Sequence, residues 1–410
     1  MSNHIRLLLT LSLPLAIVAC DGKSGETGSS ATTGDDGGDD GGDTSGFPAN
    51  AADAVLNYSN IVSASYDDSL TAAQTMDAAI TAFVAAPSED GMNAARQAWL
   101  DSREPYLQTE VYRFYDGPID NPDDGPEGFI NAWPMDEGHI DYVQGLSTAG
   151  IVNDTDTEIN AENLLAANED GGEQNVATGY HALEFLLWGQ DFSADGPGQR
   201  PWQDYDLTAP ANPNPDRRGA YLTVASELLL GHLGDMSAAW AAGGGNYRAD
   251  FEAESAEVGI ERILTGMIIL SGFETGGERL QAALDSGDQE DEHSCFSDNT
   301  HRDMVQDVVG VQNVWRGSYT RLDGSTVSGV GIRDVVEAVD ADLASRVDLR
   351  IDESVTLADA LQPPFDQEID LANTDGRARV QALIDSLKDQ ETILLEVFSL
   401  LGLSVEIPTE

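Results

Sequence analysis

The chain has 410 residues, with 20 Lys and Arg against 73 Asp and Glu, and a formal net charge of −53. A surface of this sign repels phosphate backbones and anionic headgroups, so the composition excludes nucleic acid as a partner and argues against anionic lipid as a ligand. It attracts cations. We interpret most of the charge as a solvated acidic surface, suited to a medium whose salt screens the self-repulsion.

The first residues have the pattern of an export signal. A short polar start carrying Arg6 precedes an apolar run over 7–18, which is too short to span a bilayer but has the length of a signal-peptide core. Residues 17–20, Ile-Val-Ala-Cys, are similar to the lipobox of bacterial lipoproteins, and this implies cleavage before Cys20 and lipidation of that cysteine. The alternative is an ordinary signal peptide with an incidental cysteine. We predict a signal peptide over 1–19 and attachment to a membrane through lipid on Cys20.

The segment after Cys20 differs from the rest of the chain in composition. Residues 21–46 are almost wholly Gly, Ser, Thr and Asp, and such a segment can bury little apolar area, so we predict a disordered acidic linker over 20–47. Cys295 is the one cysteine that remains once Cys20 carries lipid. A disulfide within the mature chain is therefore excluded.

Beyond the linker, apolar residues recur at helical spacing and alternating β patterns are scarce. The pattern predicts helices over 51–86, 92–115 (bent at Pro105), 158–167, 175–188 and 216–242, with irregular segments over 117–146 and 189–215. After the glycine run at 243–245 it predicts helices over 256–284, 300–320, 329–347 and 375–401, and a polar loop over 289–299. Roughly four long helices on each side of the glycines indicate an all-α fold of two antiparallel helical bundles, over 48–245 and 246–410.

The segment 179–191, Gly-Tyr-His-Ala-Leu-Glu-Phe-Leu-Leu-Trp-Gly-Gln-Asp, carries the most informative pattern. His181 and Glu184 lie three residues apart and share one face of a helix, so an imidazole and a carboxylate can bind one metal ion there. A charged Glu184 among apolar neighbours is costly unless it is paired or bound to a metal. A His–Glu hydrogen bond inside the core is the alternative, and the spacing does not separate the two.

A second segment places charges among aromatic residues. Positions 99, 103, 106, 110 and 113 fall on one helical stripe that mixes Trp and Tyr with Arg103, Glu110 and Arg113, which indicates a buried polar network rather than a solvated face. Glu110 is a candidate third metal ligand, and Arg103 and Arg113 would neutralise or orient carboxylates. A structural Arg–Glu pair is the alternative.

A third segment, 288–301, concentrates histidine, cysteine and carboxylates. His293, Cys295, Asp298 and His301 form a second candidate metal site. Acidic loops without a metal are common, so this site ranks below the first.

Together these segments closely resemble the imelysin family (peptidase M75), in particular its iron-regulated lipoprotein-like branch. The resemblance rests on the segments 109–114 and 132–134, on Gly-x-His-x-x-Glu at 179–184, and on the segments 196–201 and 293–301, which occur together in this order. It implies an all-α fold of two helical bundles with the His-x-x-Glu site near their interface. It also implies a location in the periplasm or on the outer membrane, and a role in iron uptake.

Three functions remain open. The first is an envelope-anchored protein that binds a metal ion in metal acquisition beside iron-transport proteins, with His181, Glu184, Glu110 and Asp120 as ligands; mixed oxygen and nitrogen ligands suit iron, and zinc is the alternative. The second, implied by the family, is a zinc metallopeptidase, but the sequence has no His-Glu-x-x-His and no second histidine identifiable as a ligand. The third is a module that binds haem or a peptide. We prefer the metal-binding function, and enzymatic activity stays open.

Overall fold

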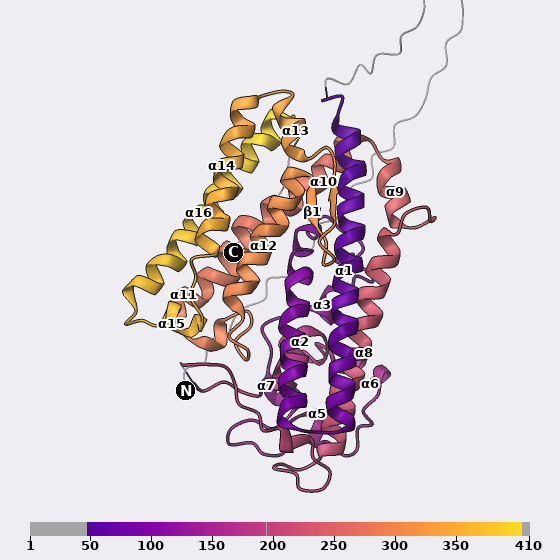
Figure 1. The fold of residues 1–410 in the computed structure, drawn as a ribbon, viewed down its shortest axis with the longest axis vertical. Coiled ribbons are helices and arrows are strands. Elements are labelled where there is room, and N and C mark those ends of the chain that lie inside the picture. The colour runs from indigo at the N-terminus through magenta and orange to yellow at the C-terminus, as the bar shows by residue number, and fades with distance from the viewer. Residues whose placement is uncertain (1–46, 194, 404–410) are drawn as a thin grey trace, which may run out of the picture. The chain divides into compact units, whose positions relative to one another are not determined.

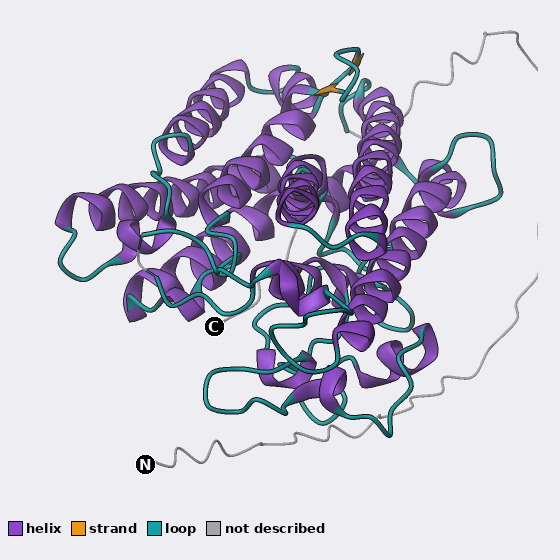
Figure 2. Cartoon of the chain, turned by 60° about the horizontal axis from the view of Figure 1, so that its bottom comes forward, coloured by secondary structure: helices purple, strands orange, loops and turns teal. Residues whose placement is uncertain are grey.

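The computed structural model describes residues 47–193 and 195–403 (Figure 1). The predicted signal peptide, Cys20 and all but the last residue of the predicted linker lie outside these residues. The described chain is helical apart from loops and one small hairpin, as Figure 2 shows. The all-α prediction is therefore confirmed.

One group of helices comes from the first half of the chain. It consists of α1 (Ala51–Ala85), α2 (Glu89–Leu107), α7 (Gly179–Trp188) and α8 (Pro215–Trp240). The Ser88 side chain accepts a hydrogen bond from the backbone N–H of Gly91 and so caps α2 after a short turn, and α1 packs against both α2 and α8. The predicted helix over 92–115 ends earlier, at Leu107, after which the chain forms a 3-10 turn, η1 (Glu110–Tyr112).

Short elements occupy the segments between these helices. They are α3 (Glu127–Ile130), α4 (Glu137–Ile140), α5 (Gly150–Asn153), α6 (Ala161–Ala167), the 3-10 turn η2 (Trp202–Tyr205) and α9 (Tyr247–Ala253). Asn160 caps α6 through a hydrogen bond from the backbone N–H of Asn163, so this helix starts three residues after the predicted position. The predicted irregular segment over 117–146 contains two helices of one turn each.

A second group of helices comes from the second half. It consists of α10 (Ala256–Ile269), the π-helical segment η3 (Leu270–Gln281), α11 (Ala282–Ser286), the 3-10 turn η4 (Gln289–Asp291), α12 (Thr300–Arg316), α13 (Ile332–Glu337), α14 (Ala341–Ala358), α15 (Phe365–Ile369) and α16 (Thr374–Leu400). The helix α16 packs against η3, α10 and α14, and α12 packs against α14. Figure 1 shows α12, α14 and α16 to one side of α1, α2 and α8.

Two predictions in the second half are wrong in detail. The predicted helix over 329–347 is two helices, because the Asp340 side chain accepts hydrogen bonds from the N–H groups of Asp342 and Leu343 and starts α14 anew. The predicted helix over 300–320 ends at Arg316. The antiparallel strands β1 (Ser318–Thr320) and β2 (Thr326–Ser328) follow it, with Tyr319 opposite Val327.

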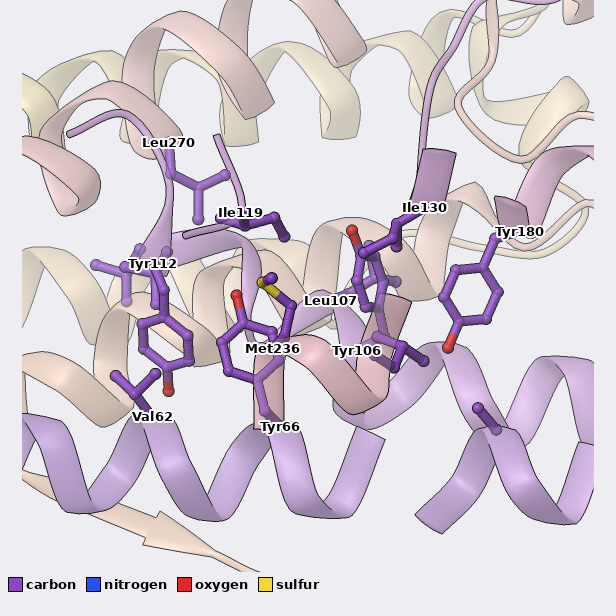
Figure 3. Close-up of a cluster of buried hydrophobic side chains, with 14 of the residues drawn as sticks. Val62, Tyr66, Tyr106, Leu107, Tyr112, Ile119, Ile130, Tyr180, Met236 and Leu270 are labelled. Carbon is purple, nitrogen blue, oxygen red and sulfur yellow. The ribbon is translucent and has the colours of Figure 1, made fainter. Parts of the chain in front are cut away.

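The larger hydrophobic core contains residues from both halves of the chain. Figure 3 shows Val62 and Tyr66 of α1 in one cluster with Met236 of α8 and Leu270 at the start of η3. Contacts of α1 with α10 and of α2 with α12 join the two groups of helices. Among the described helices, none has both the length and the apolar character that a membrane span requires.

Candidate functional site

The helix α7 is buried at every position, and it packs against α2 and α8. It begins at Gly179, whose φ is +85°, and a Cβ at this position would lie 2.5 Å from the carbonyl oxygen of Ile130. Only glycine fits this conformation and this close approach. Behind it, Tyr180 packs against Tyr106 of α2, with ring centroids 4.8 Å apart (Figure 3). The glycine of the motif therefore lets α7 enter the core with His181 and Glu184 inside.

His181 and Glu184 are hydrogen-bonded to each other. Nδ1 of His181 lies 2.9 Å from Oε2 of Glu184, while the backbone N–H and the hydroxyl of Ser297 donate to Oε1 at 2.9 and 2.6 Å. In the part of the chain that the structure describes, Nε2 of His181 is buried and has no hydrogen-bond partner. One nitrogen of this imidazole is thus fixed by a carboxylate, and the other is left available.

His293 repeats this arrangement beside it. Nδ1 of His293 lies 2.7 Å from Oδ2 of Asp303, and Arg103 donates to the same oxygen at 3.2 Å. The rings of His181 and His293 meet edge to face with centroids 4.9 Å apart. The sequence placed His293 in a separate second site, but the structure places it next to His181.

The carboxylates decide the protonation of both rings. In its ionised form each carboxylate accepts from Nδ1–H, which leaves a lone pair on Nε2. Burial, with the charge of Arg103, lowers the pKa of His181 well below its usual value, and burial with the charge of Arg279 lowers the pKa of His293 to about 4. Burial also raises the pKa of Glu184 to about 8, so without a bound cation Glu184 holds a proton at neutral pH, and binding of a cation at Nε2 of His181 would release it. Both imidazoles are neutral, which is the form that binds metals.

Arg103 supports the site from α2. Its side chain is fully buried, its guanidinium lies 4.9 Å from the centre of the Tyr180 ring, and it donates to Asn131 at 2.5 Å as well as to Asp303. Burial alone would lower the pKa of Arg103, but Asp303, Tyr106 and Glu184 together outweigh it and raise that pKa. Arg103 therefore neutralises the carboxylate behind His293, which is the kind of role that the sequence suggested for it.

A cavity of about 390 Å³ adjoins His293, and Asn131 and Trp133 also contribute to its wall. The ring of Trp133 lies 5.0 Å from that of His181. Six carboxylates and two guanidiniums also line the cavity: Glu127, Glu169, Glu173, Glu274, Glu278, Asp291, Arg113 and Arg279. The excess of carboxylates gives the cavity a negative potential, which concentrates cations near His293.

Comparison with known proteins identifies the family of this chain. The model of the imelysin family, peptidase M75, matches residues 62–394. The chain belongs to the imelysin family. The resemblance that the sequence motifs suggested is thereby confirmed.

Individual relatives of this imelysin-family chain agree with this assignment. Iron-regulated protein A of Synechococcus elongatus is 27% identical over 270 residues, which are 64% of this chain and 63% of the relative, so the match spans less than two thirds of that protein. A solved Parabacteroides distasonis protein, described as an iron-regulated protein A precursor, has a TM-score of 0.68 at 19% identity and covers 87% of this chain and 97% of its own. An imelysin-like protein from Psychrobacter arcticum has a TM-score of 0.60 at 16% identity, with the same coverage. The two structures show a shared fold.

The structure gives other partners to two predicted ligands of this imelysin site. Glu110 accepts from Arg113 at 2.8 Å and from Arg279 at 2.5 Å, and these charges hold its pKa well below its usual range although burial alone would raise it. Asp120 accepts from the backbone N–H of Phe114. Among the described residues, no hydrogen bond or ion pair joins Glu110 or Asp120 to His181 or Glu184. The Arg–Glu pair that the sequence allowed as an alternative is present.

The second predicted site does not come together as a group. Cys295 is buried in the larger hydrophobic core, and Nδ1 of His301 contacts the backbone carbonyl of Asp298 at 3.1 Å. The side chain of Asp298 instead approaches Asp191 and Asp366. His293, as described above, belongs with His181.

Sequence reasoning missed the residues that fix the two histidines, chiefly Asp303 and Ser297. One signal was present: Asp303 and Asp307 lie four apart among the buried apolar residues of α12. Charged residues on the apolar face of a helix indicate buried pairing. The sequence gives no indication, however, that the partners of Asp303 come from α2 and from the loop before α12, and those of Asp307 from η3.

Proposed function

We propose that this imelysin-family protein binds a metal ion, iron, between His181 and His293. The observation that carries the proposal is Nε2 of His181, which is buried, has no partner among the described residues and belongs to a ring in contact with His293. A buried polar atom without a hydrogen-bond partner costs about 1–3 kcal/mol. Coordination of a cation would remove that cost, and the negative cavity beside His293 would supply the cation.

The chemistry of the two imidazoles suits this role. Imidazole nitrogen is a ligand for iron and zinc alike, and a carboxylate behind a histidine fixes its orientation and increases its basicity. In this proposal Glu184 and Asp303 orient the two ligands, while water or carboxylates of the cavity complete the shell. The name of the Synechococcus relative ties that protein to iron, which favours iron over zinc here.

The test is iron binding by the purified full-length chain, measured by anaerobic titration calorimetry with Fe²⁺ and by metal analysis. We expect His181→Ala and His293→Ala to abolish tight binding, and Glu184→Gln to weaken it by about 10–100-fold, as for other residues that orient metal ligands. His139→Ala is the matched control, because the His139 ring contacts the Ala167 carbonyl in another part of the fold. Equal iron binding by the variants and the wild type would overturn the proposal.

We further propose that the protein acts at the cell envelope, in the periplasm or on the outer membrane, held by lipid on Cys20 beside iron-transport proteins. The lipobox-like residues 17–20 and the acidic composition support this role. Labelling with a radioactive fatty acid should mark the wild type and not Cys20→Ser, and the variant should leave the membrane fraction. Labelling of both proteins would contradict the anchor.

A metallopeptidase is the second candidate, because the family carries a peptidase designation and Glu184 has a pKa of about 8 beside a histidine. Zinc hydrolysis requires a metal-bound water and a free general base. Both oxygens of Glu184 are already hydrogen-bonded, to Ser297 and to His181, which favours an orienting role. Cleavage of casein by the wild type with added Zn²⁺, lost in His181→Ala, would favour the peptidase instead.

A further inference from the structure

Three carboxylates from distant parts of the chain meet away from the two histidines. Asp191 follows the end of α7, Asp298 lies in the loop before α12, and Asp366 belongs to α15. One oxygen atom from each lies within 4.8 Å of the others. All three side chains are buried, with 2%, 6% and 6% of their surface exposed. This three-aspartate cluster is therefore an interior feature and not part of the acidic surface.

A fourth carboxylate lies beside the three-aspartate cluster. Glu292 is fully buried, and in the described structure neither of its oxygens has a hydrogen-bond partner. Its carboxyl group interacts with those of Asp366 and Asp298. Both oxygens of Asp298, both of Asp366 and one of Asp191 are also buried without a partner.

The protein itself supplies little compensation for this charge. Among the described residues, no lysine or arginine forms an ion pair with Asp191, Glu292, Asp298 or Asp366, whereas the buried Asp303 and Glu110 have arginine partners. Buried carboxylates without a cationic partner carry a large desolvation cost. Either protons or a bound cation must offset it, and burial does raise the pKa of Asp298 to about 8.

We propose that Asp191, Asp298, Asp366 and Glu292 form a binding site for a calcium ion. Calcium takes 6–8 oxygen ligands at about 2.3–2.6 Å, so oxygens on opposite sides of the ion lie about 4.6–5.2 Å apart, whereas magnesium requires a tighter shell. Four carboxylates that bind through one or both oxygens provide between four and eight ligand atoms. The site uses neither His181 nor His293 and does not depend on iron binding.

The position of the cluster gives the ion a structural role. Glu292 directly precedes His293, and Asp298 directly follows Ser297, the residue that donates to Glu184. Asp191 follows the end of α7, and Asp366 lies within α15. A calcium ion in the cluster ties together the loop that presents His293 and Ser297, the end of α7 and α15.

The test is calcium binding by the full-length chain after treatment with EGTA, followed by titration calorimetry in about 0.3 M NaCl, which screens the surface charge. We expect one saturable calcium site per chain. Asp298→Asn and Asp366→Asn should weaken it by about tenfold or more, since each removes one charged ligand. The double replacement Asp123→Asn/Asp124→Asn is the matched control, because it removes two carboxylates at exposed positions and should leave the site unchanged.

The absence of a saturable calcium site in the wild type would overturn the proposal, and so would equal weakening of calcium binding by the surface control. A third contrary result would be an Asp298→Asn variant that is more stable than the wild type in EGTA and does not respond to calcium. That result would mean that protons, and not a cation, neutralise the cluster. If a variant fails to fold, the wild type still decides, because calcium must raise its melting temperature relative to EGTA. His181→Ala should keep the calcium site, so failure of the iron proposal would not imply failure of this one.

Discussion

A single glycine controls how α7 enters the core. Alanine at position 179 would have to adopt φ near +85° with its Cβ 2.5 Å from the Ile130 carbonyl oxygen, which adds about 1–2 kcal/mol of left-handed strain to a backbone clash. We expect Gly179→Ala to lower the free energy of unfolding by about 2–4 kcal/mol, measured by urea denaturation. At Gly231, inside α8, nothing lies within 4 Å of a built Cβ, so Gly231→Ala should raise it by about 1 kcal/mol. Equal effects at both positions would contradict this account.

His293 should make stability depend on pH. Its pKa is about 4 in the folded chain, against about 6.5 when unfolded. Between these values the unfolded chain binds the additional proton, so the contribution of His293 is complete above about pH 6.5 and is lost as the pH falls towards about 4, by up to about 3 kcal/mol.

The pH measurement needs a difference curve. Glu184, with its pKa raised to about 8, gives the opposite slope between about pH 4.3 and 8, because there the folded chain binds more protons. The free energy of unfolding should therefore be followed against pH for the wild type and for His293→Gln, and the two curves subtracted. Asp303 and Arg103, which face His293, stay charged throughout. A flat difference between about pH 4 and 6.5 would show that His293 does not carry the effect.

At the level of helices, the sequence predicted the elements whose apolar residues recur at helical spacing. The long amphipathic helices α1, α8 and α16 follow their predicted ranges closely, because each must bury one apolar face. The break before α14 depends on a single capping side chain, Asp340, and the hairpin after α12 has strands of three residues. Signals this short are weaker than the helical pattern around them.

The candidate site was predictable only in part for a related reason. His181 and Glu184 are three residues apart, so helix geometry alone brings them together. Their partners His293 and Ser297 lie more than a hundred residues further along the chain, and Asp366, further still, joins the three-aspartate cluster. Contacts at such separations follow from tertiary packing, which spacing does not encode.

Buried ion pairs connect η1, η3 and α12, and Arg279 is their common member. It donates to Glu110 at 2.5 Å, to Asp307 at 2.9 Å and to Glu274 at 2.9 Å. Removal of one partner of a buried pair leaves uncompensated charge. We expect Arg279→Ala to lower the free energy of unfolding by about 3–5 kcal/mol in chemical denaturation. Arg346→Ala, which removes an arginine from exposed pairs, should cost less than about 1 kcal/mol. Similar losses for both would contradict the role of burial.

The whole molecule combines buried arginine–carboxylate pairs and the three-aspartate cluster inside with an excess of carboxylates outside. In the interior, Arg103 and Arg279 balance buried carboxylates, whereas the chain as a whole has a net charge of −53. Repulsion between surface carboxylates opposes the compact state, and salt reduces that repulsion. Stability should therefore depend on ionic strength more than the ion pairs alone would suggest.

Thermal unfolding in EGTA tests this expectation without interference from calcium. Between about 0.01 and 0.3 M NaCl the Debye length falls from about 30 Å to below 10 Å, which removes repulsion between all but neighbouring carboxylates. We expect the melting temperature to rise by about 3 °C or more over this range, equivalent to roughly 2 kcal/mol for a chain of this size. Screening depends on ionic strength alone, so KCl must act like NaCl at equal concentration. A melting temperature that stays constant, or that responds to one cation and not the other, would show that self-repulsion does not limit the stability of this protein.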